Sequence, residues 1–267
     1  MAISQTIKRA CRRYEEIEAE GLTLYPILVE ELEEFEMARP SIDIVQQSLP
    51  VTYAAMPLLA AFYRMEYDAL CGGEAGIGLF SQALLMLALS LRLGRGLTPK
   101  RRVGLFRCKV DAGDAGRLKA VVFTVDGEES FEVTPVQFQR LREIIAAQNG
   151  IELAPLEANP DLIEAQRELA QMNSAALSGD VWERVATLAA LERVEESEVD
   201  EWPILKLRDK TRTWQRIVGY AVCAAAEAQG TKWENGNPYP SLFYEKEDAG
   251  NIWLRPMEQA TRHLGQV

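Results

Sequence analysis

The sequence has almost no histidine. Its 267 residues include one, His263. Ser-His-Asp triads, Cys-His pairs and HExxH zinc sites all need a histidine as a base or a metal ligand. The sequence therefore argues against these common catalytic sets, and we expect a non-enzymatic protein with no catalytic residue, cofactor or metal ion.

Cysteine is sparse and has no motif spacing. The four cysteines are scattered, and no pair has the CxxC arrangement of a redox or zinc site. The chain also lacks the charged, apolar and small-residue succession of a secretory signal. We therefore expect free, mostly buried thiols in the reducing cytoplasm of a bacterial cell. These cysteines are Cys11, Cys71, Cys108 and Cys223.

Long apolar runs and excess positive charge are also missing. The longest apolar stretch, Leu79–Leu93, is shorter than the roughly 20 residues that span a bilayer and contains Ser81, Gln82 and Ser90. It predicts a buried core helix. With 40 Asp and Glu against 29 Lys and Arg, the net charge of −11 repels phosphate backbones and anionic lipids. Nucleic acid and membranes are poor candidate partners.

The fold predicted from hydrophobic periodicity is mainly α with a small three-stranded antiparallel β-meander, an α+β class with helical regions on either side of the meander. The N-terminal region combines short helices with an extended segment, Leu22–Val29. Pro50 favours a helix start, and Pro57 marks either a kink or a second start. The predicted helices are Thr6–Glu20, Glu30–Met37, Ser48–Leu70 and the apolar helix between Gly76 and Gly96.

The centre of the chain changes to strand-like runs rich in Val and Phe. Alternation and the Asp126-Gly127 turn signal predict a meander of three strands. A helix follows, with Thr134 as N-cap, Pro135 at its first position and Asn149-Gly150 at its end. We expect its stripe of Phe138, Leu141, Ile144 and Ile145 to pack on the meander. The predicted strands are Arg102–Asp111, Arg117–Asp126 and Glu129–Val133.

The C-terminal part predicts a linker, a second helical region and an arm. The linker holds one polar helix, Pro160–Met172, and Asp180 caps the next, Val181–Glu192. An acidic turn, Ser197–Glu201, precedes a long helix that Pro203 opens and Gln229-Gly230 ends. The predicted divisions are a helical region 1–96, the meander with its capped helix 97–153, a linker 154–179, a helical region 180–230 and an aromatic arm 231–267.

Three other features carry weaker functional signals. The glycines between Cys71 and Gly78 lack the preceding strand and following Lys-Ser/Thr of a phosphate loop, so they predict a connection between helices. Acidic clusters at 30–36 and 195–201 lack the pattern of a calcium loop and are typical of solvated faces. The basic run Lys100-Arg101-Arg102 fits a charged, solvated strand edge, with docking of an acidic partner as the alternative.

The aromatic arm is the strongest candidate for partner binding. A few rigid aromatic anchors carry most of the energy of many interfaces. The alternative is that the arm folds back and covers the protein's own helices, and composition alone leaves both open. The candidate residues are Trp233, Tyr239, Phe243, Tyr244 and Trp253.

Several stretches resemble proteins encoded in the tail gene clusters of tailed phages and prophages of Gram-positive bacteria. These stretches are Leu24–Ile27, Ser48–Pro50 and Thr134–Gly150, and the residues around Val199, Trp202, Pro203, Leu207 and Trp214 resemble the last helices of tail assembly chaperones. The resemblance implies a helical, acidic protein that keeps tape-measure or tail-tube proteins soluble before assembly. The meander departs from the purely helical pattern of small tail chaperones.

Two alternatives to a tail chaperone stay open. A structural neck or baseplate component would use the same arm for permanent assembly in the particle. A metal-dependent enzyme with a site made only of carboxylates is the third hypothesis.

Overall fold

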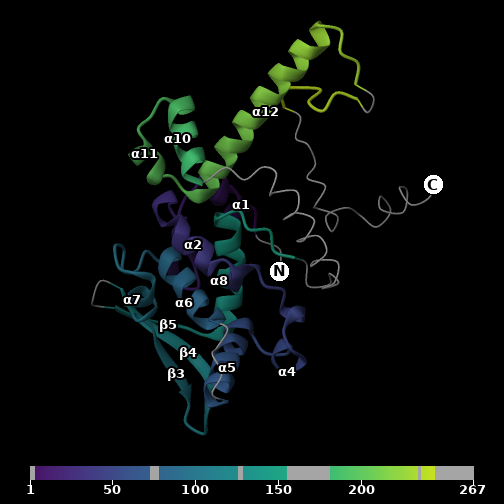
Figure 1. Cartoon of the computed structure of the whole chain (residues 1–267). Coiled ribbons are helices and arrows are strands. Elements are labelled where there is room, and N and C mark those ends of the chain that lie inside the picture. The colour runs from purple at the N-terminus through teal and green to yellow at the C-terminus, as the bar shows by residue number, and fades with distance from the viewer. Residues whose placement is uncertain (1–3, 73–77, 126–128, 155–180, 234–235, 244–267) are drawn as a thin grey trace, which may run out of the picture. The chain divides into compact units, whose positions relative to one another are not determined.

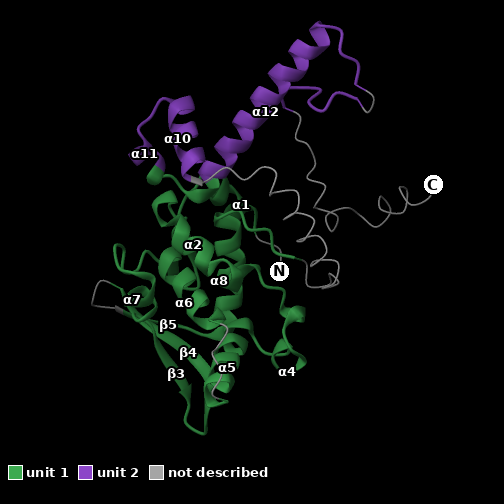
Figure 2. Cartoon of the chain, in the orientation of Figure 1, with its two compact units in different colours: residues 1–156, 200–205 green, residues 157–199, 206–267 purple. Residues whose placement is uncertain are grey.

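The computed structural model describes residues 4–72, 78–125, 129–154, 181–233 and 236–243. The chain divides into two compact units (Figure 2). The first contains residues 1–156 and 200–205, and the second contains residues 157–199 and 206–267. The fold is mainly α with two small antiparallel sheets, which confirms the predicted fold class.

The N-terminal helix is shorter than predicted. Helix α1 (Gln5–Arg12) starts at Ser4, whose hydroxyl accepts a hydrogen bond from the Ile7 N–H at 3.3 Å, and a hairpin replaces the expected helical residues up to Glu20. Glu20 and Gly21 take positive φ angles of 53° and 78°, as a two-residue hairpin turn requires. The sequence signal for this turn is the glycine. The hairpin strands are β1 (Ile17–Ala19) and β2 (Leu22–Leu24).

Short helices follow, and their starts confirm the interpretation of the prolines. Pro50 and Pro57 each lie directly before a helix, so Pro57 marks a second start. Helix α6 is buried on nearly every side, as its continuous apolar sequence predicts. The elements are η1 (Val29–Glu31), α2 (Leu32–Ala38), α3 (Pro40–Asp43), η2 (Gln46–Ser48), α4 (Val51–Ala54), α5 (Leu58–Cys71) and α6 (Leu79–Ser90).

The three-stranded meander is present, but its first strand starts later than expected. Residues Pro99–Val103 form helix α7, because Thr98 and Pro99 supply the residue types of a helix start. Phe123 packs between Phe106 and Phe131, with ring centroids 5.3 and 5.9 Å away. The strands are β3 (Arg107–Asp111), β4 (Asp114–Val125) and β5 (Glu129–Val133), in the order β3-β4-β5 (Figure 1).

Helix α8 (Pro135–Gln148) has both predicted ends. The Thr134 hydroxyl accepts from the Gln137 N–H at 3.3 Å, and the Gln137 side chain accepts from the Thr134 N–H at 2.9 Å. Gly150 has a φ of 68°, the left-handed conformation expected after a helix. The predicted apolar stripe is buried, but α8 packs against α1, α3 and α5 as well as β4. The expected contact with the meander is therefore present through β4, and other helices also cover α8.

An extended segment, Tyr25–Val29, lies at the centre of the first unit. Its backbone bonds three other parts of the chain: the Tyr25 N–H donates to the Ser90 carbonyl at 2.7 Å, and the Val29 N–H to the Trp202 carbonyl at 2.9 Å. The Ile27 N–H donates to Asn149 Oδ1 at 3.1 Å, and the Ile27 carbonyl accepts from the Ile204 N–H at 2.9 Å. A buried chain without these bonds would leave its polar backbone groups unsatisfied.

The described part of the second unit is helical up to Ala228, and the residues at 229–233 and 236–243 are not helical. Residues 196–200 form a short helix, so the predicted turn at Ser197–Glu201 was wrong, while the long helix ending before Gln229-Gly230 is confirmed. The predicted helix Pro160–Met172 and the Asp180 cap lie outside the described residues. The helices are α10 (Val181–Glu192), α11 (Glu196–Asp200) and α12 (Ile204–Ala228). The last residue of α11 and the first two residues of α12 belong to the first unit.

Asn149→Ala should destabilise the first unit by about 2 kcal/mol, since it leaves the buried Ile27 N–H without its acceptor. Urea unfolding followed by circular dichroism measures the change. Gln5→Ala truncates an exposed amide on α1 and should change the free energy of unfolding by less than about 0.5 kcal/mol. Equal effects of the two substitutions would contradict the role given to Asn149.

Candidate docking groove

The five aromatic residues predicted to bind a partner have different environments. Trp233 and Tyr239 are half-buried, and Phe243 is 81% exposed. Tyr244 and Trp253 lie outside the described residues. Within the described part of the arm, Tyr239 folds back on the chain and Phe243 faces solvent.

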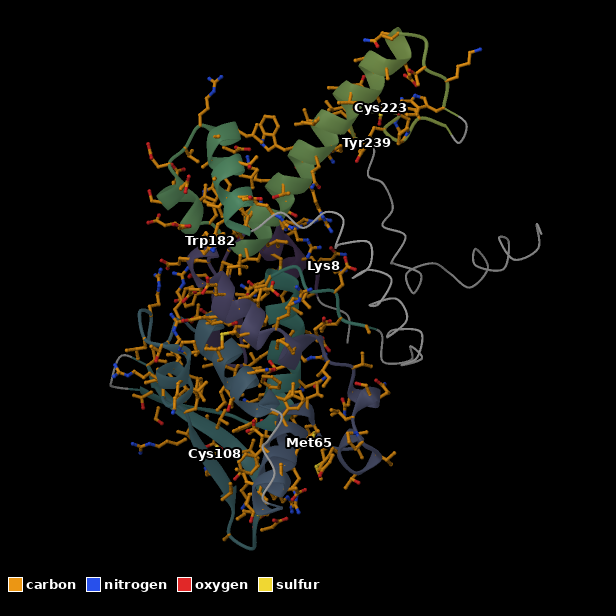
Figure 3. All side chains as sticks on the ribbon, viewed as in Figure 1. Lys8, Met65, Cys108, Trp182, Cys223 and Tyr239 are labelled. Atoms are coloured by element: carbon orange, nitrogen blue, oxygen red, sulfur yellow. The ribbon has the colours of Figure 1, made fainter. Side chains whose placement is uncertain are left out.

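Tyr239 packs directly on the backbone of α12 at Gly219. A Cβ added at Gly219 would lie 2.7 Å from Cε2 of the Tyr239 ring, so only glycine permits this approach. Polar contacts hold the same segment: Asn237 Oδ1 accepts from the Tyr239 N–H, and Asn237 Nδ2 donates to Glu227 Oε1, both at 2.8 Å. Figure 3 shows Tyr239 beside the part of α12 that carries Cys223.

Tyr239, α10 and α12 enclose a cavity of about 720 Å³ within the second unit. Helix α10 contributes Leu188 and Leu191, and α12 contributes Trp214 and Val218. The polar residues Glu183, Arg184, Thr187, Thr211 and Gln215 complete the lining. The cavity, called the helical groove below, therefore combines an apolar lining with a few polar groups, the composition that ligand and peptide sites share.

Glu192 connects the two helices of the groove. Its carboxylate accepts hydrogen bonds from Lys210 Nζ and from the Trp214 indole N–H, both at 2.8 Å. The Lys210 ammonium and then the Trp214 N–H, as hydrogen-bond donors, lower the pKa of Glu192 below its usual value. Trp214, which lines the groove, is thus oriented by a charged residue on the opposite helix.

Exposed large apolar side chains gather in the second unit. Seven of the twelve in the described residues lie there, although it contributes the smaller share of those residues. Clustered apolar exposure, unlike single exposed residues, is typical of interaction sites. The seven are Trp182, Leu191, Val218, Tyr220, Val222, Leu242 and Phe243.

Part of the basic run and of the first acidic cluster has a structural role that was not predicted, while Lys100, Arg101, Glu33 and Glu36 are exposed as expected. Arg102 is buried on α7, and its guanidinium lies 2.8 Å from Glu31 Oε1 and 3.1 Å from Glu34 Oε2. Burial raises the pKa of Glu34, and the charge of Arg102 opposes that rise. Arg95 also pairs with Glu30. The solvated strand edge expected at Lys100-Arg101-Arg102 is therefore a helix joined to the acidic segment by buried charge.

Metal and membrane sites find no support within the described ranges. There, no three His, Cys, Asp or Glu side chains are grouped as metal ligands. Among the same residues, no helix has both the length and the apolar character needed to cross a bilayer. Cys11 and Cys223 are buried as expected, whereas Cys71 and Cys108 are exposed.

No protein family, curated protein or solved structure matches the chain. The interpretation of the helical groove therefore depends on its own geometry.

The groove residues on α10 and α12 were missed by the sequence interpretation. A signal existed, because Trp214, Val218 and Val222 recur at four-residue spacing on a helix that also carries many charges. The sequence interpretation predicted a long helix there and gave this stripe no binding role. The structure leaves Val218 and Val222 exposed by 53% and 61%.

Arg102→Ala should destabilise the first unit by about 3 kcal/mol, because it leaves Glu31 and Glu34 partly or fully buried without their cation. The neighbouring Arg101 is exposed, and Arg101→Ala should be nearly neutral. Urea unfolding of both variants compares the sites directly. A similar loss at the two positions would rule out a special role for the buried arginine.

The contact between α10 and α12 should weaken in acid. Because the folded pKa of Glu192 is lowered, its stabilising effect is complete above the usual glutamate pKa, about 4.3, and is lost as pH falls through the lowered value. Trp214 fluorescence at pH 2 to 7 follows this change. Since four other tryptophans contribute, the signal is the difference from Trp214→Phe. Glu192→Gln should remove the transition, and its persistence would contradict the assignment.

Proposed function

We propose that this chain is a non-enzymatic protein of phage tail morphogenesis that binds another tail protein through the helical groove. The observation that carries the proposal is the largely apolar groove between α10 and α12, whose lining includes the exposed side chains of Leu191 and Val218. Such a surface costs free energy in water and gains it when a partner covers it.

The shape of the groove favours a helix as its occupant. Two helices with an apolar channel between them receive a third helix through residues spaced three and four apart. Leu188, Leu191, Trp214 and Val218 would contact that apolar stripe. Phe243, which follows Tyr239 by four residues, offers a further aromatic contact next to the arm segment that packs on α12.

The phage assignment comes from the resemblance to proteins of tail gene clusters and is supported by the net charge of −11. An acidic surface keeps a complex soluble and discourages association with nucleic acid. The resemblance implies that tape-measure and tail-tube proteins are kept soluble until they polymerise. We propose one of these as the partner, bound before assembly in the cytoplasm of the host cell.

The test is co-expression with the tape-measure or tail-tube protein encoded in the same gene cluster. The intact chain should raise the soluble fraction of one of them and co-purify with it. Val218→Glu places a charge in the groove and should weaken the affinity at least tenfold, the effect of losing a central apolar contact. Val51→Glu, at a site on α4 that is 91% exposed, is the matched control.

Two outcomes would contradict the proposal. If neither tail protein gains solubility, binding before assembly is wrong. If Val51→Glu weakens the complex as much as Val218→Glu, the groove is the wrong surface. Mass spectrometry of purified particles distinguishes a chaperone from a structural component. An assembly chaperone is absent from the mature particle, whereas a neck or baseplate component is present.

A further inference from the structure

A second surface lies in the first unit, along the part of β4 that β5 does not cover. Strand β5 pairs with β4 only from Val121 to Val125, and the pairing ends at Val121 opposite Val133. Strand β4 starts seven residues earlier, at Asp114, and there pairs with β3 alone. Within the described residues, Asp114–Ala120 therefore has no strand neighbour on the β5 side (Figure 1).

A cavity of about 500 Å³ follows this open edge. Four consecutive residues of β4, Gly116–Lys119, line it. Because side chains alternate between the two faces of a strand, a cavity on one face would meet every second residue. Contact with a consecutive run indicates that the cavity runs along the backbone edge, where amide and carbonyl groups point sideways.

The opposite wall is mainly apolar and close to the end of β5. It consists of Ala55–Pro57 before α5, Ala60 on α5, and Thr134–Val136 at the start of α8. Its charged residue is Arg64 on α5, which pairs with Asp68 at 2.9 Å and with Asp114 of β4 at 3.2 Å. Val136 is 59% exposed. The chain leaves the sheet at Thr134, so the place that a longer β5 would occupy is open and has an apolar side.

Charge defines the outer side of the edge. Arg117 and Lys119 both project outward from β4, and their side chains are 74% and 50% exposed. Both approach one carboxylate, that of Asp111, at 4.0 and 3.4 Å. The Gly113 N–H that donates to Asp111 lowers the pKa of this carboxyl, and the charges of Lys119 and Arg117 lower it further. The charged residues that line the cavity are the three cations Arg64, Arg117 and Lys119 and the single carboxylate Asp114, so its lining is positive in a strongly acidic chain.

We infer that this edge binds an extended peptide segment of a partner protein, added as a strand beside Asp114–Ala120. The segment alternates apolar residues, which face Met56 and Val136, with acidic residues, which face Arg117 and Lys119. The Ala115 carbonyl already accepts from the Tyr63 hydroxyl at 3.1 Å, and the Gly116 N–H donates to Asp114 Oδ1 at 2.9 Å. The part of the edge from Arg117 to Ala120 therefore supplies the backbone hydrogen bonds, and the flanking side chains supply the selectivity. This inference does not depend on the helical groove, which lies in the other unit.

The test uses a fluorescein-labelled ten-residue peptide of alternating valine and glutamate, titrated into the full chain and followed by fluorescence anisotropy. The peptide should bind saturably, at least tenfold more tightly than the same peptide with lysine in place of glutamate. Hydrogen exchange should show new protection of amides within Arg117–Ala120. Protection there reports strand addition, which simple ion pairing at the surface would not produce.

Charge-reversed variants provide the matched comparison. The double variant Arg117→Glu, Lys119→Glu should reverse the preference between the two peptides. Lys100→Glu with Arg101→Glu reverses two exposed charges on α7, outside the cavity, and should leave the preference unchanged. Circular dichroism confirms that each variant is folded.

Three results would overturn the inference. The glutamate peptide shows no saturable binding, or it binds without protecting the Arg117–Ala120 amides from hydrogen exchange, or both double variants lose the same affinity for it. If a protein captured from a cell lysate loses affinity for the Val218→Glu variant but not for the Arg117→Glu variant, that protein binds the helical groove and not the strand edge.

Discussion

The first unit depends on the hydrogen bonds of one buried extended segment, Tyr25–Val29. Ile27 and Val29 have no exposed surface, so their backbone groups have no access to water. The segment has no strand neighbour along its length in the described residues, apart from an isolated bridge between Leu28 and Pro203. Its backbone is satisfied at the ends of α6 and α8 and by Trp202 and Ile204, which belong to the first unit, so these parts of the first unit meet at one segment.

Amide side chains at the end of α8 form several of the hydrogen bonds that hold these segments. Asn149 binds Ile27, while Gln148 Nε2 donates to the carbonyls of Glu15 and Leu24 at 3.2 and 3.1 Å. The N-terminal hairpin and the extended segment thus meet the same helix end. Arg92 adds a cation–π contact, with its guanidinium carbon 4.4 Å from the centre of the Tyr25 ring. Polar groups specify this packing, and apolar burial supplies its free energy.

Local signals in the sequence predicted the elements whose causes are local. The capping box at Thr134, the proline starts at Pro50 and Pro57 and the glycine after α8 all act within a few residues, and each was confirmed. The errors arose where distant contacts decide. Arg102 is buried because Glu31 and Glu34 face it, 71 and 68 residues away in sequence.

The candidate sites were harder to predict for the same reason. The aromatic arm was visible as composition, but the helical groove exists only because Tyr239 packs on Gly219 and Glu192 holds Trp214. The open edge of β4 follows from a difference in length between β4 and β5, which hydrophobic alternation does not define sharply. Both sites depend on contacts between residues that are distant in sequence, and local sequence patterns do not define such contacts.

The most direct measurement is site-specific photocrosslinking in cells that express the full tail gene cluster, with a photoreactive amino acid in place of Val218. The account predicts a crosslink to the tape-measure or tail-tube protein, formed before particles assemble and absent when the photoreactive residue replaces Val51. Crosslinks only within the chain or between its own copies, or equal crosslinking from both positions, would contradict the claim that the helical groove holds a tail protein.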